Sequence, residues 1–219
     1  MIKENIEKVC QQIEDACARR KVPAGKVSLL VVTKGRSIPE IQQVVNAGIS
    51  QLAENRLQEA MAKYRLVTGA QWQMVGHLQT NKVKQALQIF DLIHSVDSLR
   101  LAEEIDKEAA KIGKIQDLLL EVKTSPEPVK YGFIPQELAA AVDKITRLKH
   151  LRVKGLMTIA PAVIDPQQAR PFFRQLKELR DRFNPDWLLS MGMSDDFTVA
   201  IEEGADIIRL GRIIFQEHV

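Results

Sequence analysis

The sequence predicts an α/β fold: a single closed (β/α)8 barrel of the TIM type with an extra helix at its N-terminal end. Apolar runs alternate with amphipathic stretches along the whole chain, which is typical of parallel strands joined by crossover helices. About eight such runs occur, the number that closes this barrel. No linker-like segment interrupts the alternation, so residues 1–219 are expected to form one domain.

A helix is expected over the first 20 residues, which are charged throughout and carry apolar residues at helical spacing. The apolar runs after it are short and end in polar or turn-forming residues, as strands do. The strands are expected at 27–33, 51–54, 72–75, 92–95, 117–122, 151–157, 187–190 and 206–209.

The segments between the strands carry helix start and stop signals. Capping side chains and first-turn prolines mark the starts, and glycines mark the stops. The start signals are Ser37, Thr80, Ser98, Pro135 and Asp165, and the stop signals are Gly48, Gly113 and Gly204. One loop, at 123–135, contains three prolines and can extend neither neighbouring element, so it is expected to overhang the barrel mouth.

Charge and cysteine content narrow the class of protein. Lys and Arg total 31 against 28 Asp and Glu, and this charge is spread along the chain, which argues against nucleic acid as a partner. Neither a signal peptide nor a stretch of membrane-spanning length is visible, so a cytoplasmic location is expected. Cys10 and Cys17 lie seven residues apart on the first helix, about 10 Å, too far for a disulfide.

The loops after the last two strands predict an anion pocket, because barrels of this type often bind phosphate there. Gly192 lets the backbone approach a ligand, and Ser194 can cap the next helix and donate to a phosphate oxygen. Arg209, Gly211 and Arg212 add a glycine turn and two cations after the eighth strand. The alternative is that both glycines only permit turns and that Ser194 only caps.

Lys34 follows directly on the first apolar run, which places its amine at the barrel mouth. Free lysine has a pKa of about 10.4, so a nucleophilic amine at neutral pH needs desolvation or nearby positive charge. Such an amine forms a Schiff base with an aldehyde; the alternative is a lysine that only begins the loop. An amine facing an anion pocket implies a phosphorylated aldehyde, and pyridoxal 5′-phosphate (PLP) fits, with a sugar phosphate as the rival. Arg209 favours PLP, because its fixed charge can face the pyridine nitrogen and weaken the ring as an electron sink.

Seven segments of the chain resemble the YggS/PROSC family of pyridoxal-phosphate homeostasis proteins, whose fold is similar to the N-terminal barrel of bacterial alanine racemase. In chain order they are VVTK, AENRLQEA, WQMVGHLQTNK, HSVDS, GLMTIAP, LSMGMSDDFTVAIEEGADIIRLG and IF, and they span nearly the whole sequence. The resemblance implies that Lys34 forms the internal aldimine and that Arg209 faces the pyridine nitrogen. It implies a phosphate held, partly through backbone N–H groups, by Ser194, Gly211 and Arg212. It also implies that Asn55 and Met157 line the cofactor.

The chain departs from the usual pattern of this family at four positions. Ala53 stands where glycine is usual, Gln73 where histidine is frequent, Arg212 where a small hydroxyl residue is common, and Gln216 where glycine usually follows IF. Arg212 puts a hydroxyl contact to the phosphate in doubt, although its backbone N–H and guanidinium can still bind an anion.

Other titratable residues have open roles. His77 lies in the turn after the third strand and His94 ends the fourth, and each either lies near the ligand or is structural. Lys130, in the proline-rich loop, is either a second transient aldehyde contact or a solvated lysine. His150 and His218 are expected at the surface.

The preferred function is a monomeric PLP-binding protein that holds PLP as a Schiff base without dedicated catalysis, supplies it to PLP-dependent apoenzymes and steadies the vitamin B6 pool. Racemisation needs an acid or base on each face of the cofactor, and Lys34 supplies only one. In the racemases that the barrel resembles, the other is a tyrosine from a partner subunit's C-terminal domain, which is not expected here. The alternatives are a PLP-dependent racemase or decarboxylase with Tyr131 or His77 as second proton donor, and a sugar-phosphate aldolase.

Overall fold

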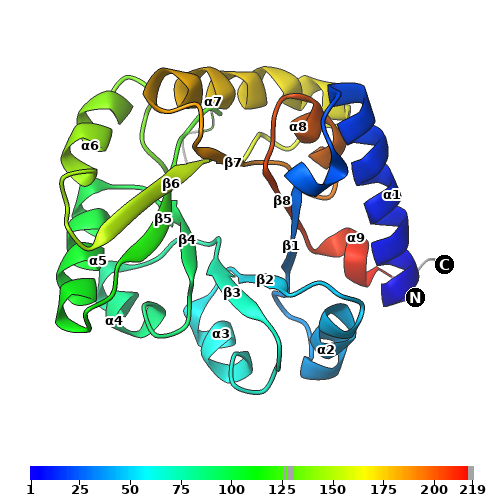
Figure 1. The fold of residues 1–219 in the computed structure, drawn as a ribbon, viewed down its shortest axis with the longest axis horizontal. Helices are drawn as coiled ribbons and strands as arrows, with labels where there is room; N and C mark the ends of the chain where they lie inside the picture. The colour runs from blue at the N-terminus through cyan, green and yellow to red at the C-terminus, as the bar shows by residue number, and fades with distance from the viewer. Residues whose placement is uncertain (126, 128–130, 217–219) are drawn as a thin grey trace.

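Eight parallel strands form a closed barrel surrounded by helices (Figure 1). The structure, a computed structural model, describes residues 1–125, 127 and 131–216. Each strand pairs with the next along the chain, and the last pairs with the first, so the predicted fold class is confirmed. The strands are β1 (Ser28–Val32), β2 (Gln51–Glu54), β3 (Gln71–Met74), β4 (Leu92–Val96), β5 (Gln116–Glu121), β6 (Leu151–Met157), β7 (Leu188–Ser190) and β8 (Ile207–Leu210).

Helices connect successive strands on the outside of the barrel (Figure 1). The α-helices are α1 (Ile2–Arg20), α2 (Ile38–Asn46), α3 (Leu57–Lys63), α4 (Val83–Ala86), α5 (Leu99–Lys111), α6 (Leu138–Ile145), α7 (Arg170–Phe183), α8 (Phe197–Glu202) and α9 (Arg212–Phe215). Three short 3-10 helices are η1 (Ala24–Lys26), η2 (Thr80–Lys82) and η3 (Pro166–Ala169). Within the described ranges, none of the helices combines the length and the apolar character that a membrane span requires.

Most predicted helix boundaries agree with the structure. Ser37 begins α2 in a capping box, in which the Glu40 carboxylate accepts the Ser37 backbone N–H at 2.8 Å. Ser98 caps α5 by accepting the N–H of Leu101 at 3.3 Å. Pro135 does not open α6, because residues 135–137 form a turn and the helix begins at Leu138. The three predicted stop glycines all have a positive φ: Gly48, Gly113 and Gly204.

The first helix covers the outside of the barrel. Its apolar stripe is buried: Ile2, Ile6, Val9, Ile13, Ala16 and Cys17. The helix packs against α8, α9 and α2 (Figure 1). Asn5 ties it to the C-terminal segment, because its amide donates to the carbonyls of Ile214 and Gln216, both at 3.0 Å. Cys10 and Cys17 are free thiols, as the spacing predicted.

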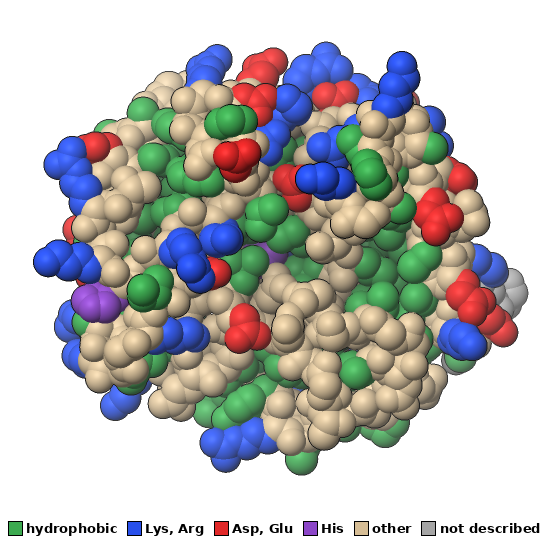
Figure 2. All heavy atoms as spheres, in the orientation of Figure 1, with side chains coloured by type: hydrophobic (Ala, Val, Ile, Leu, Met, Phe, Trp, Pro, Cys, Tyr) green, Lys and Arg blue, Asp and Glu red, His purple; other side chains and the backbone are tan. Residues whose placement is uncertain are grey.

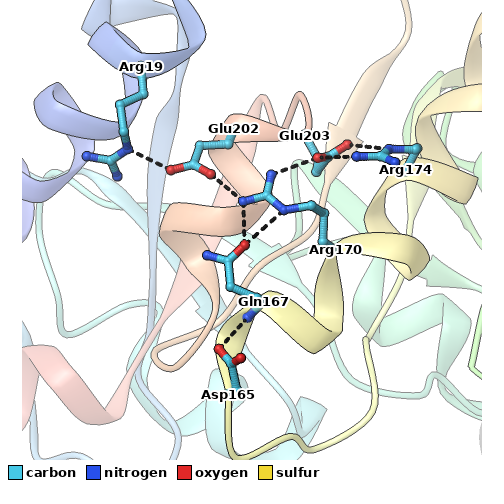
Figure 3. A network of polar contacts seen from close by, with 7 residues as sticks. All are labelled: Arg19, Asp165, Gln167, Arg170, Arg174, Glu202 and Glu203. Atoms are coloured by element: carbon cyan, nitrogen blue, oxygen red, sulfur yellow. Dashed lines mark hydrogen bonds and ion pairs between the residues drawn. The ribbon is translucent and has the colours of Figure 1, made fainter.

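Ion pairs join α1, α7 and α8 at the rim (Figure 3). Arg170 bridges two carboxylates, at 2.5 Å from Glu202 and 2.7 Å from Glu203. Arg19 of α1 pairs with Glu202 at 2.6 Å, and Arg174 pairs with Glu203 at 3.1 Å. A network of this kind fixes three neighbouring helices relative to each other more effectively than an isolated surface pair would.

The apolar core has two parts. The larger part lies between the sheet and the helices, and the smaller fills the barrel interior with Leu30, Ala53, Val75 and Ile207. Seen along the view of Figure 1, hydrophobic side chains gather around a central hollow, with charged side chains spread around them (Figure 2). The interior also holds polar side chains, among them His94, Ser190 and Arg209.

Candidate functional site

A cavity of about 260 Å³ lies where β1, β2, β3 and β8 end, under the loops that follow β6 and β7. Six residues predicted for the site line it: Lys34, Asn55, Ser194, Arg209, Gly211 and Arg212. The seventh, Met157, does not line this cavity; it is fully buried at the end of β6. Five further lining residues were not predicted from the sequence: Val32, Val75, Ile159, Met193 and Asp195.

Lys34 is the free amine of the cavity. The Lys34 side chain is exposed. The desolvation that was expected to make the amine nucleophilic is therefore not present. The Lys34 ammonium makes no hydrogen bond or ion pair with any described residue, which leaves it available to a ligand. Arg209 and Arg212 line the same cavity as Lys34.

The backbone around Lys34 is held by a buried ion pair that the sequence analysis missed. Lys63 Nζ lies 2.6 Å from the Glu54 carboxylate and donates to the Thr33 carbonyl at 2.9 Å. The Thr33 hydroxyl donates to the same carboxylate at 2.7 Å. On the other side of Lys34, the Gly35 N–H donates to Glu59 at 2.8 Å, and Glu59 lies 3.3 Å from Lys63. Both chain neighbours of Lys34 are therefore anchored to one cluster of charges.

Three backbone N–H groups at the cavity have no partner in the described part of the chain: those of Ser194, Asp195 and Gly211. Unpaired N–H groups that converge on a cavity bind anions. The predicted anion pocket thus has a physical basis at these two turns.

One prediction about the loop after β7 was wrong. Ser194 does not cap α8; the N-cap residue is Asp196, whose carboxylate accepts the Met193 N–H at 2.6 Å. Gly192 is needed for packing, because it has φ +94° and a Cβ there would lie 2.6 Å from the Ala200 side chain. The approach of a ligand to its backbone stays a prediction.

The two arginines of the pocket differ in environment. Arg209 is buried, and its Nη1 and Nη2 donate to Ser190 Oγ and to the Thr158 carbonyl, both at 2.8 Å. Burial lowers the pKa of Arg209 to about 10, against the opposing effect of nearby carboxylates, so the guanidinium is charged at neutral pH. Arg212 is exposed, and its guanidinium forms an ion pair with Asp195.

Departures from the family pattern at two positions leave the backbone unstrained. Ala53 is buried in β2 without a positive φ, so it does not need the freedom of glycine. Gln216 follows α9 in an extended conformation, and its carbonyl accepts from Asn5.

The remaining candidate residues lie away from the cavity lining. The His77 ring stacks on Tyr131 with centroids 3.8 Å apart, and its Nδ1 lies 2.7 Å from Asp97. His94 is buried inside the barrel. Lys130 lies outside the described residues. The described part of the chain contains no cluster of three or more His, Cys, Asp or Glu side chains that could hold a metal ion.

Glu121, at the end of β5, is a buried carboxyl that the sequence analysis did not single out. Burial raises its pKa from 4.5 to about 7; Asp97 adds to this effect and Arg209 opposes it. The folded chain therefore holds this proton more tightly than the unfolded chain does. The stability that follows from it is present below pH 4.5 and is lost as the pH rises through about 7.

The pH dependence of unfolding tests this carboxyl. Glu121 alone should lower the free energy of unfolding by about 2.5 kcal/mol between pH 5 and pH 8, and Glu121→Gln should remove that part of the dependence. Urea unfolding at both pH values measures it, with Glu137→Gln, which changes an exposed carboxyl, as the control. An unchanged pH dependence in the Glu121 variant would contradict the assignment.

Comparisons with known proteins show which family the chain matches. Residues 3–218 match the family described as alanine racemase, N-terminal domain. A pyridoxal phosphate homeostasis protein of Aquifex aeolicus (strain VF5) is 40% identical, and the match covers 98% of this chain and 97% of the relative. A counterpart from Vibrio cholerae is 33% identical over 99% of this chain and 96% of its own length.

Solved structures give the same result for the fold. PipY of Synechococcus elongatus PCC7942, solved with PLP bound, is 33% identical with a TM-score of 0.85, covering 98% of this chain and all of that one (100%). An unknown protein from Bifidobacterium adolescentis has a TM-score of 0.91 at 34% identity, covering 98% of this chain and 94% of that one. Alanine racemase of Clostridium difficile is 14% identical, with a TM-score of 0.74 over 98% of this chain and 57% of that one, and shares the fold alone.

Proposed function

This chain belongs to the pyridoxal phosphate homeostasis protein family, and on that premise we propose that it binds PLP in the cavity at the barrel mouth through Lys34. The proposal depends on one observation. Within the described part of the chain, a single cavity contains a lysine amine without a partner and backbone N–H groups that are free to donate hydrogen bonds to an anion. Lys34 has no partner among the described residues, and neither have the N–H groups of Ser194, Asp195 and Gly211. An amine and an anion pocket are the two contacts that a phosphorylated aldehyde requires.

The residues present fit PLP in size and polarity. The phosphate would be held by the unpaired N–H groups, by the Ser194 hydroxyl and by Arg212, with Asp195 keeping the Arg212 guanidinium at the pocket. Apolar lining residues such as Val32 and Val75 suit the ring, and Asn55 offers it a polar edge. When bound, PLP would supply an aldehyde that condenses with a primary amine to a Schiff base, with loss of water.

Arg209 would face the pyridine nitrogen. Its guanidinium is charged at neutral pH and is fixed at two nitrogens by Ser190 and Thr158. A fixed cation there disfavours a proton on the ring nitrogen and so weakens electron withdrawal by the ring. This property suits a protein that stores and delivers PLP more than one that turns over amino acids.

The candidates for a second proton donor are poorly placed for a racemase. His77 and Tyr131 stack on each other, and neither lines the cavity that Lys34 lines. This supports PLP storage without dedicated catalysis. A turnover number above about 1 s⁻¹ in a racemase or decarboxylase assay would overturn that part of the proposal.

In this role the chain would act as a cytoplasmic monomer that delivers PLP to PLP-dependent apoenzymes. Its two free thiols suit a reducing compartment. Its charge of +3 is spread along the sequence, so PLP rather than nucleic acid is the proposed ligand.

Reductive trapping tests the ligand and the attachment site together. The purified chain is incubated with PLP, with pyridoxal or with a triose phosphate, reduced with borohydride, digested and mapped by mass spectrometry. We expect a PLP adduct on Lys34, and less adduct with pyridoxal, which has no phosphate for the pocket. An adduct on another lysine, or one formed only with the sugar phosphate, would refute the proposal.

A further inference from the structure

A row of polar side chains leads from the cavity into the barrel interior. Arg209 Nη1 donates to Ser190 Oγ at 2.8 Å, and Ser190 Oγ lies 2.9 Å from His94 Nδ1. His94 Nε2 lies 2.6 Å from Gln73 Oε1. His94 and Ser190 are fully buried, so these contacts form away from water. Hydrogen bonds in such surroundings are costly to break and orient their members strongly.

Two further glutamines continue the row to the opposite mouth of the barrel. The Gln73 amide donates to the Gln51 side-chain oxygen, and the Gln51 amide donates to Gln71. Gln71 is exposed at the first residue of β3. Because the amide nitrogen of Gln73 faces Gln51, its oxygen must face His94. The row therefore has a definite direction.

This direction fixes the tautomer of His94. An amide oxygen can only accept, so His94 Nε2 must carry the proton that faces Gln73. Burial, aided by the charge of Arg209, lowers the pKa of His94 well below 6.5, so the ring is neutral and its Nδ1 has a free lone pair. Nδ1 then accepts the Ser190 hydroxyl proton, which leaves the Ser190 oxygen lone pairs for Arg209.

We propose that His94 is a positioning residue, which holds Ser190 as a hydrogen-bond acceptor and thereby holds the Arg209 guanidinium against the ligand cavity. With the other tautomer, His94 and Arg209 would both donate to Ser190, and the hydroxyl proton of Ser190 would lose its acceptor. Ser190 has a second lone pair and would still accept from Arg209, but a buried hydroxyl without an acceptor destabilises this arrangement and so the position of the guanidinium. The effect of His94 on PLP affinity rests on the proposed function, whereas the position of the proton on the His94 ring does not.

Gln73 decides this arrangement. Its amide nitrogen is already committed to Gln51, so its oxygen can only accept from His94. Gln73 therefore sets the protonation of His94 and, through Ser190, the orientation of Arg209.

The tautomer is measured on the ligand-free chain. Long-range ¹H–¹⁵N spectra of the imidazole at neutral pH should show His94 as neutral, with the proton on Nε2. A neutral ring protonated on Nδ1, or a doubly protonated ring, would overturn the proposal whether or not the chain binds PLP.

The effect on the cofactor site is measured with two variants. His94→Leu removes the acceptor for Ser190, whereas His94→Asn places an amide oxygen near the position of Nδ1 and breaks only the link to Gln73. PLP titrations followed by visible absorbance should show affinity about tenfold or more weaker for His94→Leu, as expected from a disturbed contact to a charged group. His94→Asn should stay within about threefold of the parent chain.

A matched control separates positioning from loss of stability. Gln116→Leu also removes a fully buried polar side chain, one that donates to the Asp91 and Asp117 carbonyls and does not contact Arg209. It should lower thermal stability without weakening PLP binding. Equal PLP affinity in His94→Leu and the parent, or equal losses in His94→Leu and Gln116→Leu, would overturn the positioning role. If the parent chain itself takes up no PLP, the proposed function fails. The spectra of the His94 ring then decide alone whether His94 holds Ser190 as proposed.

Discussion

A Lys34→Met chain is expected to fold normally and to lose covalent PLP altogether. After borohydride reduction, the adduct seen in the parent chain should fall to background, and the visible absorbance of bound PLP should disappear. The reason is that, among the residues that the structure describes, Lys34 is the only lysine lining the cavity, and its amine has no partner there. For the same reason its loss should change the free energy of unfolding by no more than about 0.5 kcal/mol, as at other exposed positions.

Two companion variants show whether the amine itself matters. Lys34→Arg keeps the charge but cannot form a Schiff base, so it should bind PLP reversibly at most and trap none. Lys26→Met removes an exposed lysine near the opposite end of β1 and should behave as the parent does. Full adduct in Lys34→Met, or its loss in Lys26→Met, would show that the attachment point is elsewhere.

The barrel could be predicted because its signals are local. Each strand is a short apolar run, and helix boundaries such as Ser37 and Ser98 are set by side chains that bond to backbone a few residues away. The order of strands then follows from the alternation, because parallel strands joined by helices wind in one direction. The predicted start of α6 at Pro135 was three residues too early. Such errors arise because β-turns and the first turns of helices favour the same residue types.

The residues of the anion pocket could be found from their place after the last strands, but their roles could not. Gly192 lies in a glycine-containing turn of the kind that often binds a ligand. The atoms that a Cβ at this position would meet belong to α8. Ser194 has the signal of a cap, yet Asp196 two residues later begins the helix. Such choices depend on how a loop packs against elements distant in sequence. The same holds for Met157, whose position at a strand end does not bring it to the cavity.

The buried groups were the hardest to foresee. Glu54 and Lys63 look like a strand-end carboxylate and a helix-surface lysine, and only the closing of α3 over the end of β2 brings them within 2.6 Å. The interior row from Arg209 to Gln71 joins β8, β7, β4, β3 and β2, so no local pattern marks it. Long-range contacts of this kind position the site, and sequence periodicity does not contain them.

The ion pair beneath Lys34 leads to the second large effect: Lys63→Met should lower the free energy of unfolding by about 3–5 kcal/mol. The loss is large because Glu54 is fully buried and would keep only the Thr33 hydroxyl as a donor. Thr33 would also lose its anchor to Lys63, so Lys34 should be held less well and trap PLP more slowly. Urea unfolding measures the first effect, and the rate of adduct formation in the folded chain measures the second.

Two comparisons make this prediction specific. Lys107→Met breaks an exposed pair with Glu104 on α5 and should cost less than about 1 kcal/mol. Adding Glu54→Leu to Lys63→Met removes the stranded charge and should restore part of the stability, because replacing both members of a buried pair is often nearly neutral. That double variant should still trap PLP slowly, since neither anchor of Thr33 returns. A Lys63→Met chain as stable as the Lys107→Met chain would contradict the first effect and would mean that Glu54 reaches water. A normal rate of PLP trapping by the Lys63→Met chain would contradict the second effect and would mean that the turn at Lys34 keeps its shape without the ion pair.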